Sequence, residues 1–263
     1  MQPYTGFAAV YDLFMDNVPY DDWADYVQKL LKKNKIEDGL LLELGCGTGS
    51  MTRCLASKGF DMIGIDYSEE MLGIARDINS KGENNILYLC QDMREFELYG
   101  TVKAVISVCD SMNYILSEQD LLQVFKLVNN YLDPKGVFIF DLDTEYAYRE
   151  ILGDNTISEN REEGSFIWEN TYYEEEQMNE INLTLFVPQE GKPESEEEVL
   201  YRKYEEIHYR RAYDIARIKE LIEEAGMEWI AVYDSLTMKK PKKGCERVYI
   251  IAREMHQSDK LYI

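Results

Sequence analysis

The first motif that could take part in ligand chemistry consists of three glycines at alternate positions. They lie in Glu43-Leu44-Gly45-Cys46-Gly47-Thr48-Gly49, at the end of the apolar run 40–44. Glycine lets the backbone turn sharply and lets a ligand lie against bare main chain. A dinucleotide fingerprint requires another glycine at position 50, where Ser50 stands. The spacing therefore predicts a strand-to-helix turn that suits a ligand without a pyrophosphate; a purely structural tight turn is the alternative.

Two carboxylates follow the next strand-like runs. Asp66 ends the apolar run 60–65, one strand–helix unit after the glycines. A carboxylate there can accept hydrogen bonds from both ribose hydroxyls, although a simple turn carboxylate is the alternative. Asp92, in Gln91-Asp92-Met93, can accept from an exocyclic amine or cap the segment after it. Ser68 is placed to cap the helix that follows Asp66.

Alternating helices and strands must position these motifs. We predict helices at 7–16, 22–33, 48–58, 68–78 and 118–131, and strands at 40–44, 60–65, 86–90, 102–109 and 137–141, with a turn at 133–136. Strands separated by helices of this length indicate parallel crossovers. The first 150 residues therefore predict an α/β fold with a doubly wound, mostly parallel sheet.

The pattern changes at about residue 150. Residues 164–211 alternate partially, most clearly at 181–185, which predicts about three antiparallel strands with an acidic hairpin-like break at 188–198. A helix at 215–225, stopped by Gly226, and strands at 227–237 and 247–252, joined by the basic turn 239–244, close the chain. These are the predicted parts: a main domain of 1–150 and 212–255, an inserted antiparallel β lid at 151–211, and a tail at 256–263.

Charge and composition limit the classes of molecule that the protein is expected to bind. The net charge is -22, from 28 basic and 50 acidic residues, and nucleic-acid binding depends on Lys and Arg, so we expect no DNA partner and disfavour RNA. Five cysteines without a CxxC pair favour a reducing compartment. No cluster has metal-ligand spacing, and no segment is long enough to span a bilayer. We expect a cytoplasmic monomer or homodimer without a metal or a membrane partner.

The motifs ELGCGTG, GIDYSEEML and CQDM, in this order, resemble class I S-adenosylmethionine-dependent methyltransferases. The resemblance covers about residues 1–150 and the closing helix and strands. It implies a Rossmann-like sheet of seven strands and S-adenosyl-L-methionine as cofactor. The implied contacts are Gly45, Cys46 and Gly47 on the methionine part, Asp66 on the ribose, Asp92 and Met93 on the adenine, and Tyr67 and Met71 packed on adenine or ribose. Tyr11, Glu43, Gln91, Cys109 and Asp110 complete the expected cofactor-binding set.

Further segments are similar to the small-molecule branch of that family. They are Phe7-Ala8-Ala9-Val10-Tyr11-Asp12, the stretch 109–114 after the fourth strand, and the stretch 208–213. This branch, which includes sugar-amine and glycine-type N-methyltransferases, often carries an antiparallel sheet after its fifth strand. A [DN]-P-P-[FYW] element is missing after the fourth strand, which puts DNA-adenine and protein-glutamine acceptors in doubt.

The predicted mechanism is placement of a nucleophile beside an already electrophilic methyl group. An amine acceptor must be neutral to attack, so a base would help. We consider Tyr11, Asp110, Tyr114, His208 and Tyr213, and we predict Tyr11, Asp110 and His208 as catalytic. The alternative role for Tyr11 is helix packing. The alternative for His208 is an ordinary position on a partly exposed sheet face.

We predict methyl transfer to a small soluble acceptor, with an amine favoured by the excess of acidic residues between 150 and 206. The alternative explanation is that these acidic residues only keep an exposed sheet soluble. An RNA or protein methyltransferase, or a non-catalytic S-adenosylmethionine-binding module, are the alternative functions.

Overall fold

Seven strands form the central sheet of the molecule, sheet A. The computed structural model describes residues 8–82, 85–189, 199–256 and 260. The sheet order is β10-β11-β5-β4-β1-β2-β3. The strands are β1 (Leu40–Leu44), β2 (Asp61–Asp66), β3 (Leu87–Cys90), β4 (Val102–Ser107), β5 (Leu132–Asp143), β10 (Met227–Asp234) and β11 (Arg247–Glu254). Strands β1 to β5 pair in parallel, whereas β11 is antiparallel to both β5 and β10. The predicted doubly wound, mostly parallel fold is confirmed.

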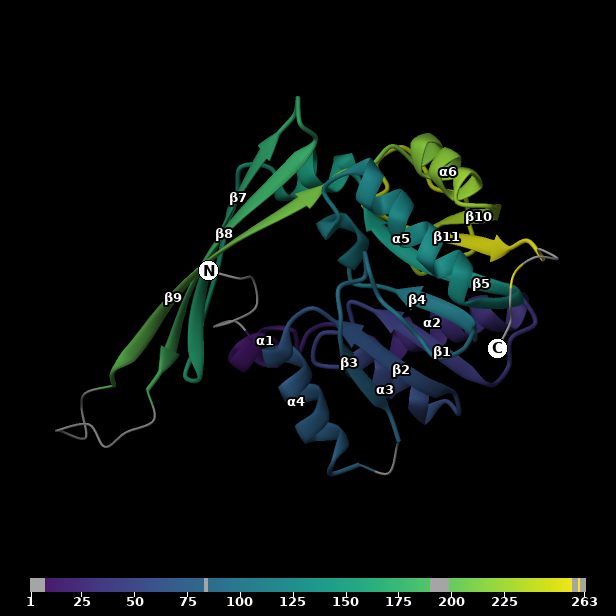
Figure 1. The fold of residues 1–263 in the computed structure, drawn as a ribbon. Coiled ribbons are helices and arrows are strands. Elements are labelled where there is room, and N and C mark those ends of the chain that lie inside the picture. Colours follow the sequence, from purple (N-terminus) through teal and green to yellow (C-terminus); the bar gives the residue numbers. More distant parts are fainter. Residues whose placement is uncertain (1–7, 83–84, 190–198, 257–259, 261–263) are drawn as a thin grey trace.

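Helices cover both faces of sheet A (Figure 1). They are α2 (Tyr20–Lys33), α3 (Ser50–Ser57) and α4 (Glu69–Asn79) on one face, and α5 (Glu118–Tyr131) and α6 (Ile215–Glu224) on the other. Neighbouring residues of β1 show the consequence: Leu41 packs into one core and Leu42 into the other, both fully buried. A strand covered on both faces is mostly apolar, which explains the four leucines of β1. The expected continuous apolar run is interrupted by Glu43, which is nevertheless buried.

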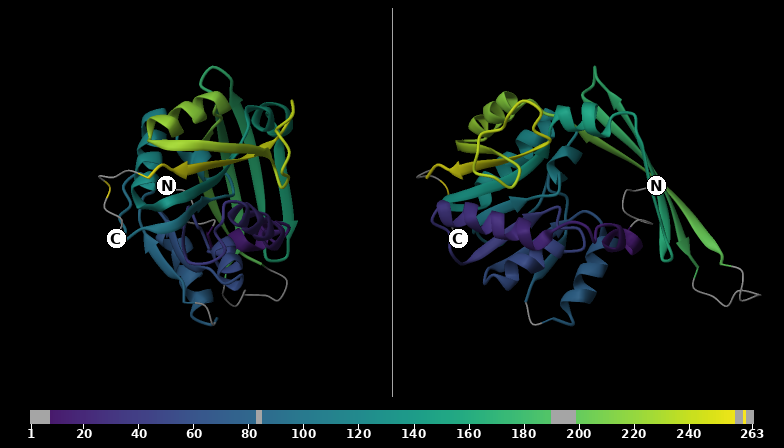
Figure 2. Two further views of the ribbon diagram at one scale, coloured as in Figure 1. Left: turned by 90° about the vertical axis from the view of Figure 1, so that its right-hand side faces the viewer. Right: turned by 180° about the vertical axis from the view of Figure 1, so that it is seen from behind.

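A second sheet, sheet B, follows β5 and stands beside the core as an arm (Figures 1 and 2). Its antiparallel strands are β6 (Thr156–Arg161), β7 (Gly164–Tyr173), β8 (Met178–Pro188) and β9 (Tyr201–Arg211). The π-helical turn η2 (Ala147–Leu152) leads into it. Along β9, Glu206 and His208 are buried while Glu205, Ile207 and Tyr209 are exposed. Sheet B therefore turns one face toward the core and the other toward solvent.

Helix α1 (Ala8–Phe14) connects the two sheets. Its Asp12 accepts a hydrogen bond of 2.7 Å from Thr48 Oγ1 in the glycine turn. Its Phe14 packs edge-on against Phe166 of β7, with ring centroids 4.9 Å apart. Arg161 of β6 donates to the carbonyl of Leu13 over 2.6 Å. The helix thus touches the cofactor turn on one side and sheet B on the other.

Several predicted boundaries differ from the structure. Sheet B has four strands, because the polar segment β6 pairs with β7 although its own sequence shows no apolar alternation. Strand β5 begins at Leu132, and the predicted turn at 133–136 is an irregularity within it, with Lys135 at φ 66°. The predicted helix 48–58 begins at Ser50 because Gly49 is left-handed. Phe7, the break at 190–198 and most of the predicted tail lie outside the described residues.

Candidate active site

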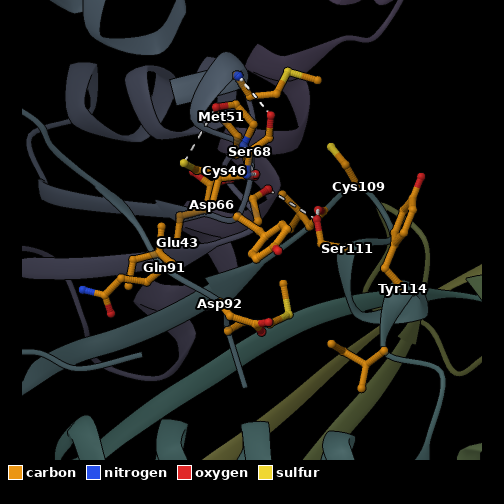
Figure 3. Close-up of a pocket in the computed structure, with 18 of the residues that line it drawn as sticks. Glu43, Cys46, Met51, Asp66, Ser68, Gln91, Asp92, Cys109, Ser111 and Tyr114 are labelled. Carbon is orange, nitrogen blue, oxygen red and sulfur yellow. Dashed lines mark hydrogen bonds between the residues drawn. The ribbon is translucent and has the colours of Figure 1, made fainter. Parts of the chain in front are cut away.

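A cavity of about 580 Å³ opens at the carboxyl ends of β1, β2, β3 and β4. Figure 3 shows its wall, with Gln91 at one end and Tyr114 and Cys109 at the other. Strands β2 and β4 flank β1, and the chain order reverses there. Open α/β sheets bind their ligands at such a switch point.

The glycine turn forms the floor of the cavity. Gly45 and Gly47 both have left-handed backbones, with φ of 71° and 54°. A Cβ on Gly45 would lie 2.6 Å from Ser111 Oγ, whereas a Cβ on Gly47 would meet nothing within 4 Å. Gly45 therefore permits close packing of the turn, and Gly47 presents bare main chain to the cavity.

Asp66 ends β2 beside this turn. Its Oδ2 accepts from the Gly47 N–H over 2.7 Å, and its Oδ1 accepts from the Ser68 N–H over 2.9 Å. Burial raises the pKa of the Asp66 carboxyl above its ordinary value, and these N–H donors oppose that rise. Ser68 caps α4 by accepting from the Met71 N–H, as predicted. The carboxylate is thus fixed at the cavity wall with lone pairs left for a ligand.

Glu43 lines the cavity from β1 and is almost fully buried. Its Oε2 accepts from Thr52 Oγ1 over 2.5 Å. Burial raises the pKa of Glu43 to about 8 despite that bond. The side chain is therefore directed at helix α3, and it ties the glycine turn to that helix.

Asp92 and Gln91 follow β3. Asp92 caps the next residues through the Arg94 N–H (2.8 Å) and pairs with the Arg94 guanidinium, which lowers the pKa of the carboxyl. Gln91 accepts from the Glu97 N–H over 2.7 Å. Tyr67, 61% exposed, and Met93 complete this end of the cavity. A carboxylate beside an exposed aromatic ring suits a flat base that carries an amine.

Tyr11 of α1 and Tyr20 of α2 form the opposite end with Cys109. The two tyrosine hydroxyls share a hydrogen bond, and burial raises the pKa of Tyr11 well above its ordinary value. Tyr11 therefore stays a neutral hydroxyl near neutral pH.

The segment after β4 has an unusual backbone. Cys109 and Asp110 are consecutive non-glycine residues with φ of 60° and 54°. Asp141 of β5 holds both, because its carboxylate accepts from the Cys109 N–H (3.1 Å) and from the Asp110 N–H (2.8 Å). Burial raises the pKa of Asp141 to about 7. Left-handed backbones of this kind persist only where the surroundings impose them.

The carboxylate of Asp110 lies off the cavity wall, in a buried ionic cluster. It pairs with Arg247 of β11 over 3.0 Å and with Arg210 of β9 over 2.7 Å. Arg247 also pairs with Asp143 over 2.7 Å. The structure thus gives Asp110 partners that join sheet A to sheet B.

Tyr114 ends the 3-10 turn η1 (Ser111–Tyr114) and lines the cavity. Its hydroxyl lies 3.3 Å from His208 Nδ1. His208 is buried on β9 and lies behind Tyr114, so it does not itself line the cavity. Tyr213 donates its hydroxyl to the Ile115 carbonyl and packs in the core.

Every residue predicted to bind the cofactor lines the cavity except Asp110. The following lining residues were not predicted to bind the cofactor: Tyr20, Thr48, Ser50, Met51, Ile65, Ser68, Arg94, Val108, Ser111, Ile115, Leu116, Ser117 and Asp120. It also missed Glu206, which stands two residues before His208 and shares its face of the strand; the two-residue period could have found it. Among the described residues, no group of three or more metal-ligating side chains could hold an ion. No helix in the same part of the chain is long and apolar enough to cross a membrane.

The sheet order and the glycine turn at its switch point define a Rossmann-like enzyme that binds an adenosine-type ligand. A family model described as a methyltransferase domain matches residues 41–136. A putative methyltransferase, YqeM, of Bacillus subtilis is 33% identical over 95% of this chain and 97% of its own length. The chain therefore belongs to the class I S-adenosylmethionine-dependent methyltransferases, and it is an enzyme that uses S-adenosylmethionine.

Two further proteins refine this placement. A crystal structure of an S-adenosylmethionine-dependent methyltransferase from Clostridium acetobutylicum matches with a TM-score of 0.82 and 28% identity, over 97% of this chain and 100% of that one. A dTDP-3-amino-3,4,6-trideoxy-alpha-D-glucopyranose N,N-dimethyltransferase of Streptomyces venezuelae is 28% identical over 57% of this chain and 62% of its own.

Proposed function

We propose that this enzyme methylates a small, soluble acceptor at an amine nitrogen. When bound, S-adenosylmethionine supplies an electrophilic methyl group on its sulfonium. The residues described above fit that ligand, because Gly47 presents open main chain and the carboxylates of Asp66 and Asp92 line the same cavity as the exposed ring of Tyr67.

The observation that carries the proposal is the end of the cavity beyond the glycine turn. Three tyrosines, Tyr11, Tyr20 and Tyr114, line that end from α1, α2 and η1. Sheet B supports it, since Tyr114 contacts His208 and Arg210 of β9. A cavity of about 580 Å³ is in the range of small-molecule sites, roughly 300–1,000 Å³.

Charge and similarity favour an amine. Acidic residues far outnumber basic ones between 150 and 206, and such a field concentrates cationic ligands. The Streptomyces venezuelae relative is named for N,N-dimethylation of an amino sugar. An amine arrives as a cation and must lose a proton before it attacks.

We assign roles accordingly. The methionine part of the cofactor contacts Gly45, Cys46, Gly47 and Tyr11; the ribose contacts Asp66; the adenine contacts Asp92, Met93, Tyr67 and Met71. Asp110 joins sheet A to sheet B rather than touching the acceptor, because its carboxylate is engaged by Arg210 and Arg247. Sheet B, from Thr156 to Arg211, acts as the lid over the acceptor.

The test is an acceptor screen with S-adenosylmethionine labelled in its methyl group. Paired amines, alcohols and carboxylic acids are compared at low and high salt. We expect transfer to an amine, with kcat/KM falling as ionic strength rises and rising with pH. Asp66→Ala serves as the control with weakened cofactor binding. Transfer to a neutral phenol or an acid, without salt dependence, would contradict the amine assignment.

A further inference from the structure

We propose that Tyr114 removes the acceptor's proton and passes its own to His208, which Glu206 holds in place. This inference rests on the proposed function, since it describes how an amine is deprotonated at that same site. It assigns the chemistry to Tyr114, which lines the cavity, and makes His208 and Glu206 act through it.

The three side chains form one continuous line. The Tyr114 hydroxyl lies 3.3 Å from His208 Nδ1, and His208 Nε2 lies 3.2 Å from Glu206 Oε2. The tyrosine and imidazole rings meet edge-on, with centroids 6.0 Å apart. His208 and Glu206 are 3% and 2% exposed. Such bonds are often long in unliganded enzymes and tighten with substrate.

The order of donors follows from the groups at each end. Glu206 Oε2 lies at ion-pair distance from His208 Nε2 in an orientation that forms no hydrogen bond in this structure, and a carboxylate there favours a proton on Nε2. The lone pair of Nδ1 is then directed at the Tyr114 hydroxyl. Arg210 Nη2 only donates, and it lies 3.2 Å from the same hydroxyl oxygen. The Tyr114 hydroxyl can therefore donate to His208, whereas it can only accept from Arg210.

Arg210 also stabilises charge on the tyrosine. Its guanidinium carbon lies 5.1 Å from the Tyr114 ring centroid and 5.5 Å from that of Trp168. Its ion pair with Asp110 fixes it there. A cation at the phenol oxygen favours the phenolate that forms as the proton leaves.

The proton balance is simple. The ammonium form of the acceptor gives one proton to the Tyr114 oxygen, while the hydroxyl proton moves to His208 Nδ1. The amine becomes neutral and its nitrogen lone pair is free for the methyl group. The imidazolium that results is stabilised by Glu206, and net charge is conserved.

The alternative is a polar cluster that only packs sheet B against the core. The same face of β8 carries Ile181, Leu183 and Leu185, all at most 2% exposed. An apolar residue at 206 or 208 would fit such a face at a lower free-energy cost, because burying ionisable groups is unfavourable.

Other titratable or charged groups around the relay are Arg210 on β9, Asp110 after β4, Asp143 on β5, Tyr148 on η2, Arg247 on β11, Asp120 on α5, Tyr11 on α1 and Tyr20 on α2.

Nuclear magnetic resonance tests the relay without an acceptor. The chain has two histidines, so His256→Asn leaves His208 as the single imidazole signal. In that protein, saturated with S-adenosylhomocysteine, we expect the Nε2–H tautomer. Glu206→Gln should weaken that tautomer preference, because a glutamine amide can donate as well as accept a hydrogen bond. An Nδ1–H tautomer, or an unchanged tautomer ratio in Glu206→Gln, would overturn the relay.

Kinetics with the amine found in the screen give the second readout. His208→Asn keeps a hydrogen-bonding side chain but cannot take a proton, and Tyr114→Phe removes the hydroxyl. Each should lower kcat by about 100-fold or more, with the Kd for S-adenosylhomocysteine within about twofold. His256→Asn should keep wild-type activity. Wild-type kcat in His208→Asn at every pH would overturn the relay, whereas a screen without any amine substrate would overturn the proposed function.

Discussion

Sheet A and sheet B build their parts of the site by different means. Sheet A is buried on both faces, and its contribution comes mainly from strand ends and main chain, such as the Gly47 turn and the left-handed Cys109. Sheet B has one inward face, and its contribution comes from alternate side chains of β9, namely Glu206, His208 and Arg210. A site built from main chain depends on the fold, whereas a site built from side chains can change through single substitutions. We infer that sheet A sets cofactor binding and sheet B sets acceptor chemistry.

Removal of sheet B is the strongest test of that division. The side-chain amide of Asn113 donates to the carbonyls of Asp143 (3.1 Å) and Arg211 (2.8 Å), so the two ends of the insert lie close together. A short glycine–serine linker can therefore replace residues 154–210, which includes β6. We expect methyl transfer to fall at least about 1000-fold, because the acceptor loses its positioning, while calorimetry shows S-adenosylhomocysteine binding within about tenfold.

Circular dichroism and thermal melting of the shortened protein provide the control. Loss of cooperative folding would show that sheet B is part of the core fold and not a separable lid. Retained transfer would show that acceptor chemistry belongs to sheet A.

Asp66→Ala should weaken cofactor binding, the function inferred for sheet A. The variant leaves the ribose without a charged acceptor, and such hydrogen bonds contribute roughly 1.5–3 kcal/mol. We expect the affinity for S-adenosylhomocysteine to fall about 10- to 100-fold by calorimetry. Asp61→Ala, at the exposed start of the same strand, is the matched control and should bind normally. Equal affinity in both variants would exclude Asp66 from cofactor binding.

Buried carboxyls should make sheet A sensitive to pH. The pKa of Glu43 is raised to about 8, so the folded protein holds this proton more tightly than the unfolded chain does. Its stabilising effect is complete at low pH and is lost as pH rises from its ordinary value of 4.5 through about 8. Asp141, with a pKa of about 7, acts in the same direction.

Glu43→Gln should remove the first of these contributions while keeping an acceptor for Thr52. From pH 5 to pH 8, we expect the unfolding free energy of the variant to gain roughly 3 kcal/mol relative to wild type in urea titrations. Glu205→Gln, on the exposed face of β9, is the control and should shift little at either pH. A constant difference between Glu43→Gln and wild type would contradict the raised pKa.

Arg161→Ala should have the smallest effect and tests the connection through α1. Arg161 pairs with Asp16 over 2.7 Å and bonds the Leu13 carbonyl, but its partner Asp16 is exposed. Exposed ion pairs stabilise little, so we expect Tm to fall by a few degrees at most. S-adenosylhomocysteine affinity should stay within about threefold, as in the control Lys203→Ala. A tenfold loss would show that sheet B governs cofactor binding through α1.

The sequence by itself determined the local features of the cofactor half. The apolar run of β1, the glycine spacing and the Ser68 cap each depend on residues close together in the chain, and the structure agrees with all three. The motif order also placed Asp66 and Asp92 at one edge, because carboxyl ends of parallel strands share an edge. Strand β6 escaped prediction, because its pairing comes from β7 rather than from its own pattern.

Tertiary structure decided which side chains meet. Tyr114 and His208 are 94 residues apart, and Asp110 and Arg247 are 137 apart. No local period links such positions, since a side chain at a strand end takes its direction from the charges packed against it. Asp110 accordingly turns toward two arginines and away from the cavity, while Tyr114 connects the cavity to β9. Sequence motifs therefore predicted which residues line the cavity, and only packing between the two sheets brought Tyr114 and His208 together.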